Sequence, residues 1–382
     1  LYFETKDSSY SIPYKAFYEM SNLQDKLIIP SSITIIGEYA FSGCGFYHVV
    51  FESQILTPST SPTIKEGAFY NCKNLNDTIN FGNIATISKR AFAGCSRLPS
   101  IDFGTSNLPI FERSAFEDCS SLDFKVNFPT TKPGTNPYII NKYAFSGCSS
   151  LEGTHGHLII PAYIDTIDDY AFQGCAFQHL EFKKRDAQSD ALTLGVGAFS
   201  GCKYISFDLV LPYLKGKKIP DRSFSGCSRI QYIEYPDNIK IIGKYAFNGC
   251  SGVKGPLEIP SSVKRIEDYA FAGCSGYSGS LTINVEPSDD VQTIIGPHAF
   301  EGCSGFKKGE LHIFVENDEE SFRAYGNTGP NQNQFPYFRY RYFLRIGTEA
   351  FKDTKFKNVY YNGRFQPDCD YDIGFSHTKG IH

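Results

Sequence analysis

The chain has 382 residues, 37 basic and 41 acidic side chains, and a formal net charge of −4. This near-neutral chain lacks the excess of Lys and Arg that neutralises phosphates in nucleic-acid-binding proteins, so we expect no nucleic-acid partner. Hydrophobic residues make up 41% of the sequence, which is enough for a packed core, and no apolar run approaches the ~18 residues of a membrane span.

One short motif repeats along almost the whole sequence. A phenylalanine preceded by alanine, or once by serine, recurs at intervals of 23 to 29 residues, and the last interval, 51, is about two periods. Such a period indicates an architecture of stacked supersecondary units. The thirteen copies are marked by Phe17, Phe41, Phe69, Phe92, Phe116, Phe145, Phe172, Phe199, Phe224, Phe247, Phe271, Phe300 and Phe351.

Two further positions keep phase with this phenylalanine. A large apolar residue stands five residues before it in every copy, from Ile12 to Ile346. Three residues after it stands a cysteine in eleven copies, and only the first and last copies depart, with Met20 and Thr354. We expect these residues to form a structural ladder, which includes Phe41, Phe92, Phe172, Phe247, Phe271, Cys44, Cys95, Cys175, Cys250 and Cys274.

Residues 257–274 show the local structure that one copy predicts. Leu257 and Ile259 alternate with a polar residue, which is the period of a short strand with one buried face. Pro260 ends that strand because it has no N–H to donate. Ala, Phe and Cys of the motif are spaced so that one helical turn would direct all three inward. A unit this small cannot bury its own apolar face, so the copies must stack into a solenoid.

The same residues resemble a known family. The segments LIIPSSITIIGEYAFSGC (27–44), IEYPDNIKIIGKYAFNGC (233–250) and LEIPSSVKRIEDYAFAGC (257–274) are similar to the BspA-type leucine-rich repeat of bacterial and protist surface proteins. The resemblance covers roughly residues 8 to 362. It implies a curved right-handed solenoid with one short parallel strand per repeat on its concave face. It also implies display at the cell surface, adhesion to host proteins in some members, and no enzyme activity.

The fold expected from the repeat and the resemblance is an α/β-type repeat solenoid of about 13 repeats. We expect a parallel concave β-sheet with short helical turns on the convex side. The solenoid would span residues 1–362, with a long insertion at 315–343, and residues 363–382 would form a C-terminal tail or cap.

The twelve cysteines favour neither a metal site nor disulfides. No Cys-x-x-Cys pair occurs, and one ligand per ~25 residues of a solenoid does not converge on a tetrahedral point. Ladder cysteines on stacked repeats would point the same way, against the geometry of a disulfide. We expect small buried hydrophobes with a weak S–H donor, and Cys369 alone outside the ladder. His48, His157 and His179 are spread over several repeats, so we expect no metal and no cofactor.

The outward side chains of the strands form the surface that solenoids commonly use for binding. On this surface Glu181, Asp208, Glu234 and Glu258 predict an acidic patch that would favour a basic partner. A solvated face without a ligand explains the same residues equally well.

Two other candidate features lie outside the ladder. The long insertion ends in an aromatic and basic segment, 335–345, and its alternation of rings and guanidinium groups suits stacking on a sugar, a protein or a second subunit. A hairpin that covers the end of the core is the other interpretation. Asn76 begins the one glycosylation sequon. The candidate binding residues of the insertion are Tyr337, Arg339, Tyr340, Arg341 and Tyr342.

Two functional hypotheses follow. In the first, the protein is a secreted or cell-surface adhesion or binding protein that contacts a protein or glycan through the concave sheet and residues 316–343. In the second, it is a structural subunit that assembles end to end, because the terminal strands of a solenoid are open edges. No catalytic motif occurs, so we expect no enzyme. The chain begins at Leu1 without an initiator methionine, so we expect a mature form or a fragment whose export signal or anchor lies outside it.

Overall fold

A computed structural model of the protein divides the chain into two compact units. Unit 1 comprises residues 1–216 and 222–234, and unit 2 comprises residues 217–221 and 235–382. The structure describes residues 3, 10–52, 63–81, 84, 86–103, 109–123, 128, 137–150, 156–185, 191–286, 292–315, 344–362, 367–370 and 372–373.

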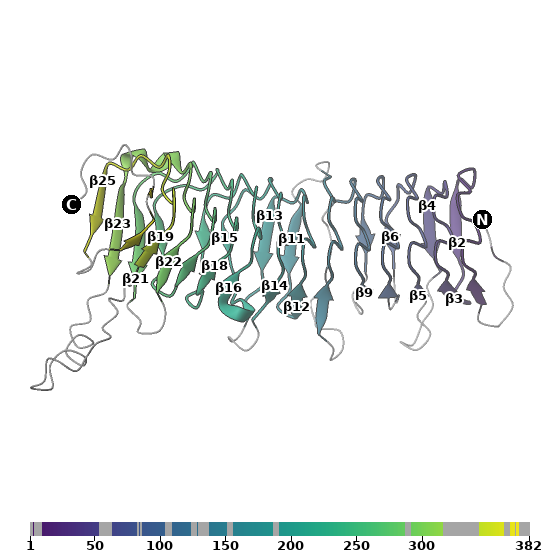
Figure 1. Ribbon diagram of the computed structural model, residues 1–382. Coiled ribbons are helices and arrows are strands. Elements are labelled where there is room, and N and C mark those ends of the chain that lie inside the picture. The colour runs from purple at the N-terminus through teal and green to yellow at the C-terminus, as the bar shows by residue number, and fades with distance from the viewer. Residues whose placement is uncertain are drawn as a thin grey trace, which may run out of the picture. The chain divides into compact units, whose positions relative to one another are not determined.

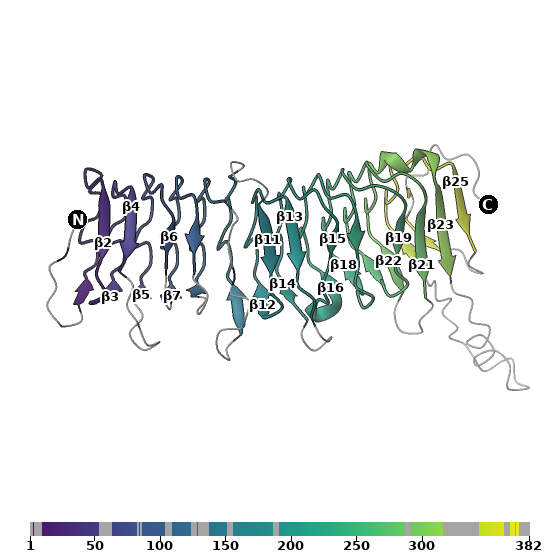
Figure 2. The same ribbon diagram turned by 180° about the vertical axis from the view of Figure 1, so that it is seen from behind.

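Unit 1 is a solenoid of parallel strands in two layers, and each turn of the chain passes from one layer to the other (Figures 1 and 2). The first layer is an eight-stranded sheet of β1 (Tyr10–Ile12), β3 (Ile33–Ile36), β5 (Thr63–Ile64), β7 (Thr86–Ile87), β9 (Ile110–Phe111), β10 (Tyr138–Ile140), β12 (Ile164–Ile167) and β14 (Thr193–Leu194). The second layer consists of the pairs β2 (Lys26–Ile29) and β4 (His48–Phe51), β6 (Ile79–Asn80) and β8 (Ile101–Asp102), β11 (His157–Ile160) and β13 (His179–Phe182), and β15 (Leu209–Val210) and β17 (Ile233–Glu234).

Unit 2 repeats this plan. Its first layer is a six-stranded sheet of β16 (Lys218–Ile219), β18 (Ile241–Ile242), β20 (Arg265–Ile266), β22 (Thr293–Ile295), β24 (Leu344–Ile346) and β26 (Asp368–Cys369). Its second layer is a four-stranded sheet of β19 (Leu257–Ile259), β21 (Leu281–Val285), β23 (Glu310–Val315) and β25 (Asn358–Tyr361). The helical elements of the described residues are two short 3₁₀ turns, η3 (Lys215–Lys217) and η4 (Ser304–Lys308).

Each repeat whose two strand segments are both described contributes two short strands, where the sequence predicted one. The predicted strand forms the second layer. The additional strand ends at the apolar residue five positions before the ladder phenylalanine, as at Ile36 and Ile242, and both side chains are fully buried. Ile and Thr dominate these positions and fit a pleated, half-buried surface. Successive copies of the additional strand therefore pair into the parallel sheet of the first layer.

The helical turns predicted around the motif are absent from the described residues, and a series of tight turns takes their place. The N–H groups of Ala40, Ser42 and Cys44 donate to carbonyls three residues earlier. The N–H groups that alternate with them donate to the next coil, as Phe41 does to Ala68 at 2.8 Å.

Positive φ angles explain why a helix does not form there. The residues two before and two after the ladder phenylalanine both have positive φ, as at Tyr39 (53°) and Gly43 (71°). A left-handed residue at each position breaks the helical path, and it releases every second N–H for the neighbouring coil.

The ladder phenylalanines stack along the centre of each unit. In unit 1 the rings of Phe145 and Phe172 are 5.4 Å apart and nearly parallel, and in unit 2 those of Phe271 and Phe300 are 5.2 Å apart. Phe41, Phe92, Phe172, Phe247 and Phe271 are all fully buried. Offset ring stacks of this spacing add to the hydrophobic stabilisation from burial.

The ladder cysteines are the buried S–H donors that the sequence predicted, and the structure adds their acceptors. Each thiol for which the structure gives a partner donates to the carbonyl of the ladder phenylalanine one coil earlier, as Cys44 does to Phe17 at 3.0 Å and Cys274 to Phe247 at 3.1 Å. All twelve cysteines are free thiols, eleven are buried, and Cys369 is exposed. Burial raises the pKa of Cys44 to about 11, so this thiol stays protonated at neutral pH.

Candidate binding surfaces

The second layer of unit 1 exposes apolar side chains to solvent. Ile159 on β11, Phe207 and Val210 at β15, and Tyr232 before β17 are 38%, 52%, 51% and 53% exposed. We call these four residues the unit 1 patch. Phe207, Val210 and Tyr232 lie on the successive coils of β15 and β17, whereas Ile159 lies on β11, and the coil of β13 separates it from them.

The predicted acidic residues of unit 1 lie among these apolar side chains. Glu181 on β13 stands opposite Ile159, and Glu234 on β17 stands opposite Val210. Glu181 forms an ion pair with Lys183 at 2.6 Å, which partly neutralises its negative charge. Asp208 immediately precedes β15. The acidic residues of unit 1 therefore belong to a mixed apolar and acidic surface.

The fourth predicted acidic residue, Glu258, lies on β19 of unit 2 and accepts a hydrogen bond from the side chain of Asn284 at 3.3 Å. The last two strands of its sheet, β23 and β25, carry a line of rings. His312 on β23 stacks with Tyr360 on β25 at 5.0 Å and lies 5.7 Å from the ring of Phe314. We call these three residues the unit 2 ring stack.

Polar groups border the ring stack. Glu310 accepts hydrogen bonds from the amide of Asn358 at 2.9 Å and from the Tyr360 hydroxyl at 3.4 Å. The Asn358 hydrogen bond holds the pKa of Glu310 below its usual value, so this carboxylate is ionised at neutral pH. Sequence reasoning did not single out Phe314 or Phe207, because each lies outside the short apolar strand core that the repeat predicts.

The aromatic and basic residues of the insertion, Tyr337, Arg339, Tyr340, Arg341 and Tyr342, lie outside the described residues. Asn76 is described and exposed, and its N–H donates to the carbonyl of Tyr47 at 3.1 Å. The sequon threonine, Thr78, shares a short hydrogen bond of 2.5 Å with the Ser100 hydroxyl. Asn76 therefore stays a predicted glycosylation site.

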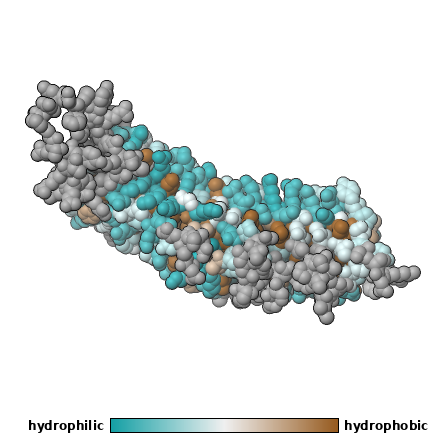
Figure 3. Space-filling model, turned by 90° about the horizontal axis from the view of Figure 1, so that it is seen from below, coloured by the Kyte–Doolittle hydropathy of each residue, from teal (hydrophilic) through white to brown (hydrophobic). Residues whose placement is uncertain are grey.

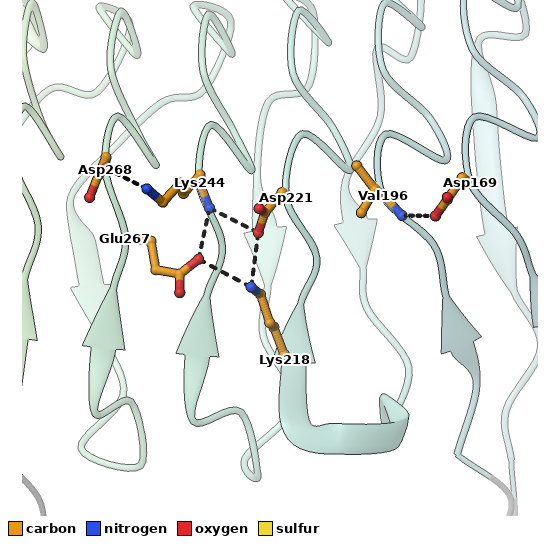
Figure 4. Close-up of polar contacts among 7 residues, drawn as sticks. All are labelled: Asp169, Val196, Lys218, Asp221, Lys244, Glu267 and Asp268. Atoms are coloured by element: carbon orange, nitrogen blue, oxygen red, sulfur yellow. Dashed lines mark hydrogen bonds and ion pairs between the residues drawn. The ribbon is translucent and has the colours of Figure 1, made fainter.

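A second set of polar residues follows the first-layer strands (Figure 4). In unit 2, Lys218 forms ion pairs with Asp221 at 2.9 Å and with Glu267 at 3.1 Å, and Lys244 pairs with Asp268 at 2.8 Å. In unit 1, Asp169 of the same turn pairs with Lys142 at 3.2 Å and accepts a hydrogen bond from the backbone N–H of Val196 at 2.8 Å.

These contacts tie one coil to the next. Since almost every charge in this set already has a partner within the chain, the set is better suited to holding coils together than to binding a ligand.

Among the residues that the structure describes, exposed hydrophobic ones do not form one large patch on the face that Figure 3 shows. On the face shown in Figure 3, the residues that are coloured are mostly hydrophilic, and the hydrophobic ones form separate small spots. In the described part of the chain, no helix has both the length and the apolar character of a membrane span.

Comparisons with known proteins agree with the coil geometry. The family profile for the BspA type leucine rich repeat region matches residues 2–123, 46–155, 125–254 and 255–367. No curated protein matches the chain.

Solved structures from several bacteria are similar. A leucine-rich repeat protein of Bacteroides ovatus is 22% identical, with 82% of this chain and 84% of that chain covered and a TM-score of 0.50. A leucine rich cell surface protein of Faecalibacterium prausnitzii is 20% identical over 84% and 86% of the two chains, with a TM-score of 0.38. The pneumococcal vaccine antigen PcpA is 17% identical over 86% and 75%, with a TM-score of 0.41. Because the family profile matches most of its length, the chain belongs to the BspA-type leucine-rich repeat family.

Proposed function

We propose that this chain is a non-enzymatic, surface-displayed binding protein that contacts a protein partner through the second layer of unit 1. The observation that carries this proposal is the unit 1 patch. Four large apolar side chains on or next to the second-layer strands are exposed to solvent, and acidic residues lie among them. Apolar and aromatic side chains surrounded by charged ones are typical of protein interfaces, where buried Tyr and similar residues supply most of the binding energy.

The charge of the patch suggests the chemistry of the partner. Asp208 and Glu234 lie next to the apolar side chains, and within the described part of the chain neither forms an ion pair. A partner surface with an apolar centre and a Lys- or Arg-containing rim would satisfy both features. Family membership supports display at the cell surface or secretion, because members of this family are surface proteins.

Binding assays on matched variants test this proposal. The intact chain would be presented to panels of purified extracellular-matrix proteins and to a glycan array. We expect binding to one or more proteins, with affinity reduced at least tenfold in the triple variant Phe207→Ser, Val210→Thr and Tyr232→Ser. Circular dichroism would establish that the variant is folded.

A control set changes exposed apolar residues of the other layer of unit 1. Ile35, Ile110 and Ile139 are 39%, 56% and 42% exposed, and replacing all three by Thr should leave affinity unchanged. An equal loss of affinity in both triple variants, or binding to glycans alone, would contradict the proposal.

A second candidate function is assembly of copies end to end. In the second coil, the carbonyls of Glu38, Ala40 and Ser42 accept N–H groups from the first coil at 3.0, 2.8 and 2.7 Å. Among the described residues, no backbone N–H donates to the equivalent carbonyls of the first coil, those of Tyr14, Ala16 and Tyr18. Free acceptors on a terminal coil are a template for pairing with another chain.

Negative-stain microscopy and light scattering at increasing concentration distinguish the two functions. Filaments that disappear in the variant Tyr14→Lys with Tyr18→Lys would support assembly. A monodisperse monomer at all concentrations would exclude it and leave the binding function in place.

A further inference from the structure

We propose that unit 2 contains a binding site for a divalent transition-metal ion, formed by His298, Glu301 and Glu349. One ligand atom from each residue lies within 4.8 Å of the other two. The site is independent of the sheet surfaces described above and of the binding function proposed for unit 1.

The backbone brings the three residues together from two stacked coils. His298 and Glu301 lie two residues before and one residue after Phe300, and Glu349 lies two residues before Phe351. The rings of Phe300 and Phe351 stack 5.5 Å apart and are almost parallel, and the N–H of His298 donates to the carbonyl of Thr348 at 3.0 Å. The coil packing therefore holds the ligand backbones in a fixed arrangement, which lowers the cost of ordering them around an ion.

The Nδ1 atom of His298 carries the argument. This atom is buried and, among the described residues, makes no hydrogen bond. Carboxylate oxygens of Glu301 and Glu349 nevertheless lie 3.0 and 3.3 Å away. A buried polar atom without a hydrogen bond is costly and needs an explanation. An ion bound to all three ligand atoms would satisfy the nitrogen and both carboxylates at once.

The two distances from His298 Nδ1 fit such an ion. Two ligand atoms that each lie about 2.0–2.1 Å from a tetrahedral zinc ion are about 3.3 Å apart. The separations from Nδ1 to the two carboxylate oxygens, 3.0 and 3.3 Å, are close to this value. One face of the imidazole is covered by Tyr269, whose ring stacks on that of His298 at 4.5 Å. The stack keeps the ring edge turned toward the two carboxylates.

The ligand types select the class of metal. A neutral imidazole nitrogen favours zinc and its neighbours in the transition series, whereas calcium and magnesium prefer oxygen ligands only. Three protein ligands leave at least one position for water. The site joins the coil before residues 315–343 to the coil after them, so a bound ion would cross-link the two sides of the long insertion.

In the metal-free protein, the ammonium group of Lys352 supplies the positive charge beside the two carboxylates. Its ammonium group lies 2.8 Å from Glu349 and 3.6 Å from Glu301. Its side chain is 43% exposed, so it can turn into solvent when an ion displaces it. The lysine therefore weakens metal binding by competition, and its removal should strengthen binding.

Titration with cobalt and zinc tests the proposal. The intact chain would carry Cys369→Ser, which removes the exposed thiol as a competing ligand. Co²⁺ should give visible absorption bands of a protein-bound ion, and Zn²⁺ should displace it with a stoichiometry of one. Ca²⁺ and Mg²⁺ should not displace it. His298→Gln, Glu301→Gln and Glu349→Gln should each weaken Co²⁺ binding at least tenfold, and Lys352→Met should strengthen it severalfold.

His48→Gln is the matched control, because His48 faces a single carboxylate, Asp77, at 3.2 Å. This variant should bind Co²⁺ as the parent does. Thermal melting without metal would show that each variant is folded. Zn²⁺ should raise the melting temperature of the parent, of His48→Gln and of Lys352→Met, and should not raise that of the three ligand variants. Absence of Co²⁺ binding in folded Lys352→Met, or binding that His298→Gln leaves unchanged, would overturn the proposal.

Discussion

The two units have the same kind of inward-facing residues in their first-layer strands and different outward-facing ones. In the first-layer strands of both units, the residue five positions before the ladder phenylalanine points inward and is buried, as Ile140 and Ile242 show. The residue just before it forms an outer column. In unit 1 this column is uncharged: Ser11, Ile35, Thr63, Thr86, Ile110, Ile139, Thr166 and Thr193. In unit 2 it consists of charged residues and isoleucine: Lys218, Ile241, Arg265, Ile294, Arg345 and Asp368.

This difference shows which positions the stack constrains. An inner side chain is packed by the coils above and below, so only a large apolar residue fits. An outer side chain meets solvent on one side, and β-branched and charged residues both satisfy the sheet there. The outer columns and the second-layer faces are therefore free to carry function, and they are where the two units diverge.

Shortening a ladder phenylalanine should have the largest effect, and a similar one in both units. Phe172→Ala in unit 1 and Phe271→Ala in unit 2 should each lower the free energy of unfolding by about 3–5 kcal/mol, because each empties a fully buried site. Phe17→Ala should cost less, since Phe17 lies on the first coil and is only half-buried. Urea denaturation followed by circular dichroism would measure all three. Equal costs for Phe17 and Phe172 would show that burial within the stack does not decide stability.

Substitution of two neighbouring isoleucines compares the stability contributed by an inner and by an outer position. Ile140→Ala should cost about 2–5 kcal/mol, because Ile140 is 1% exposed. Ile139→Ala, at the adjacent outer position, should cost well under about 1 kcal/mol. Ile242→Ala and Ile241→Ala should repeat the contrast in unit 2. The contrast would fail if both members of either pair had the same midpoint of denaturation.

Salt should affect the outer column of unit 2 and not that of unit 1. Lys218→Ala removes ion pairs with Asp221 and Glu267 and should cost at most about 1 kcal/mol, because the groups are partly exposed. The cost should shrink as ionic strength rises. Thr166→Ala in unit 1 is the matched variant, and its cost should not depend on salt. Melting temperatures at low and high salt would show whether the two variants respond differently.

A small acid dependence should also belong to unit 2. The backbone N–H of Thr348 donates to Asp370 at 2.8 Å and holds the pKa of Asp370 below its ordinary value. A carboxyl group whose pKa is lower when folded stabilises the fold above its unfolded pKa of about 3.9, and that contribution is lost as the pH falls further. Asp370→Asn should therefore destabilise the protein slightly at neutral pH and flatten the loss of stability below about pH 4. Identical pH profiles for the two proteins would contradict this.

The sequence by itself determined the repeat, the buried phenylalanines and the parallel strands of the second layer. These follow from side-chain type and spacing, because a residue such as Phe172 or Ile259 has a stable place only against its copies one period away. The family resemblance rests on the same in-phase residues. The acidic positions Glu181, Asp208, Glu234 and Glu258 could be assigned to strands or their edges in this way, but the apolar side chains around them could not.

Only the tertiary structure decided the rest. The motif reads as a helical turn because Ala, Phe and Cys have helical spacing, yet left-handed residues at Tyr39 and Gly43 turn alternate N–H groups toward the next coil. That choice is made by hydrogen bonds between coils, which no single repeat contains. For the same reason, His298 and Glu349 are 51 residues apart in sequence and adjacent in space. In a solenoid, the spacing of residues along the sequence determines which positions repeat. The stacking of coils determines which residues contact one another.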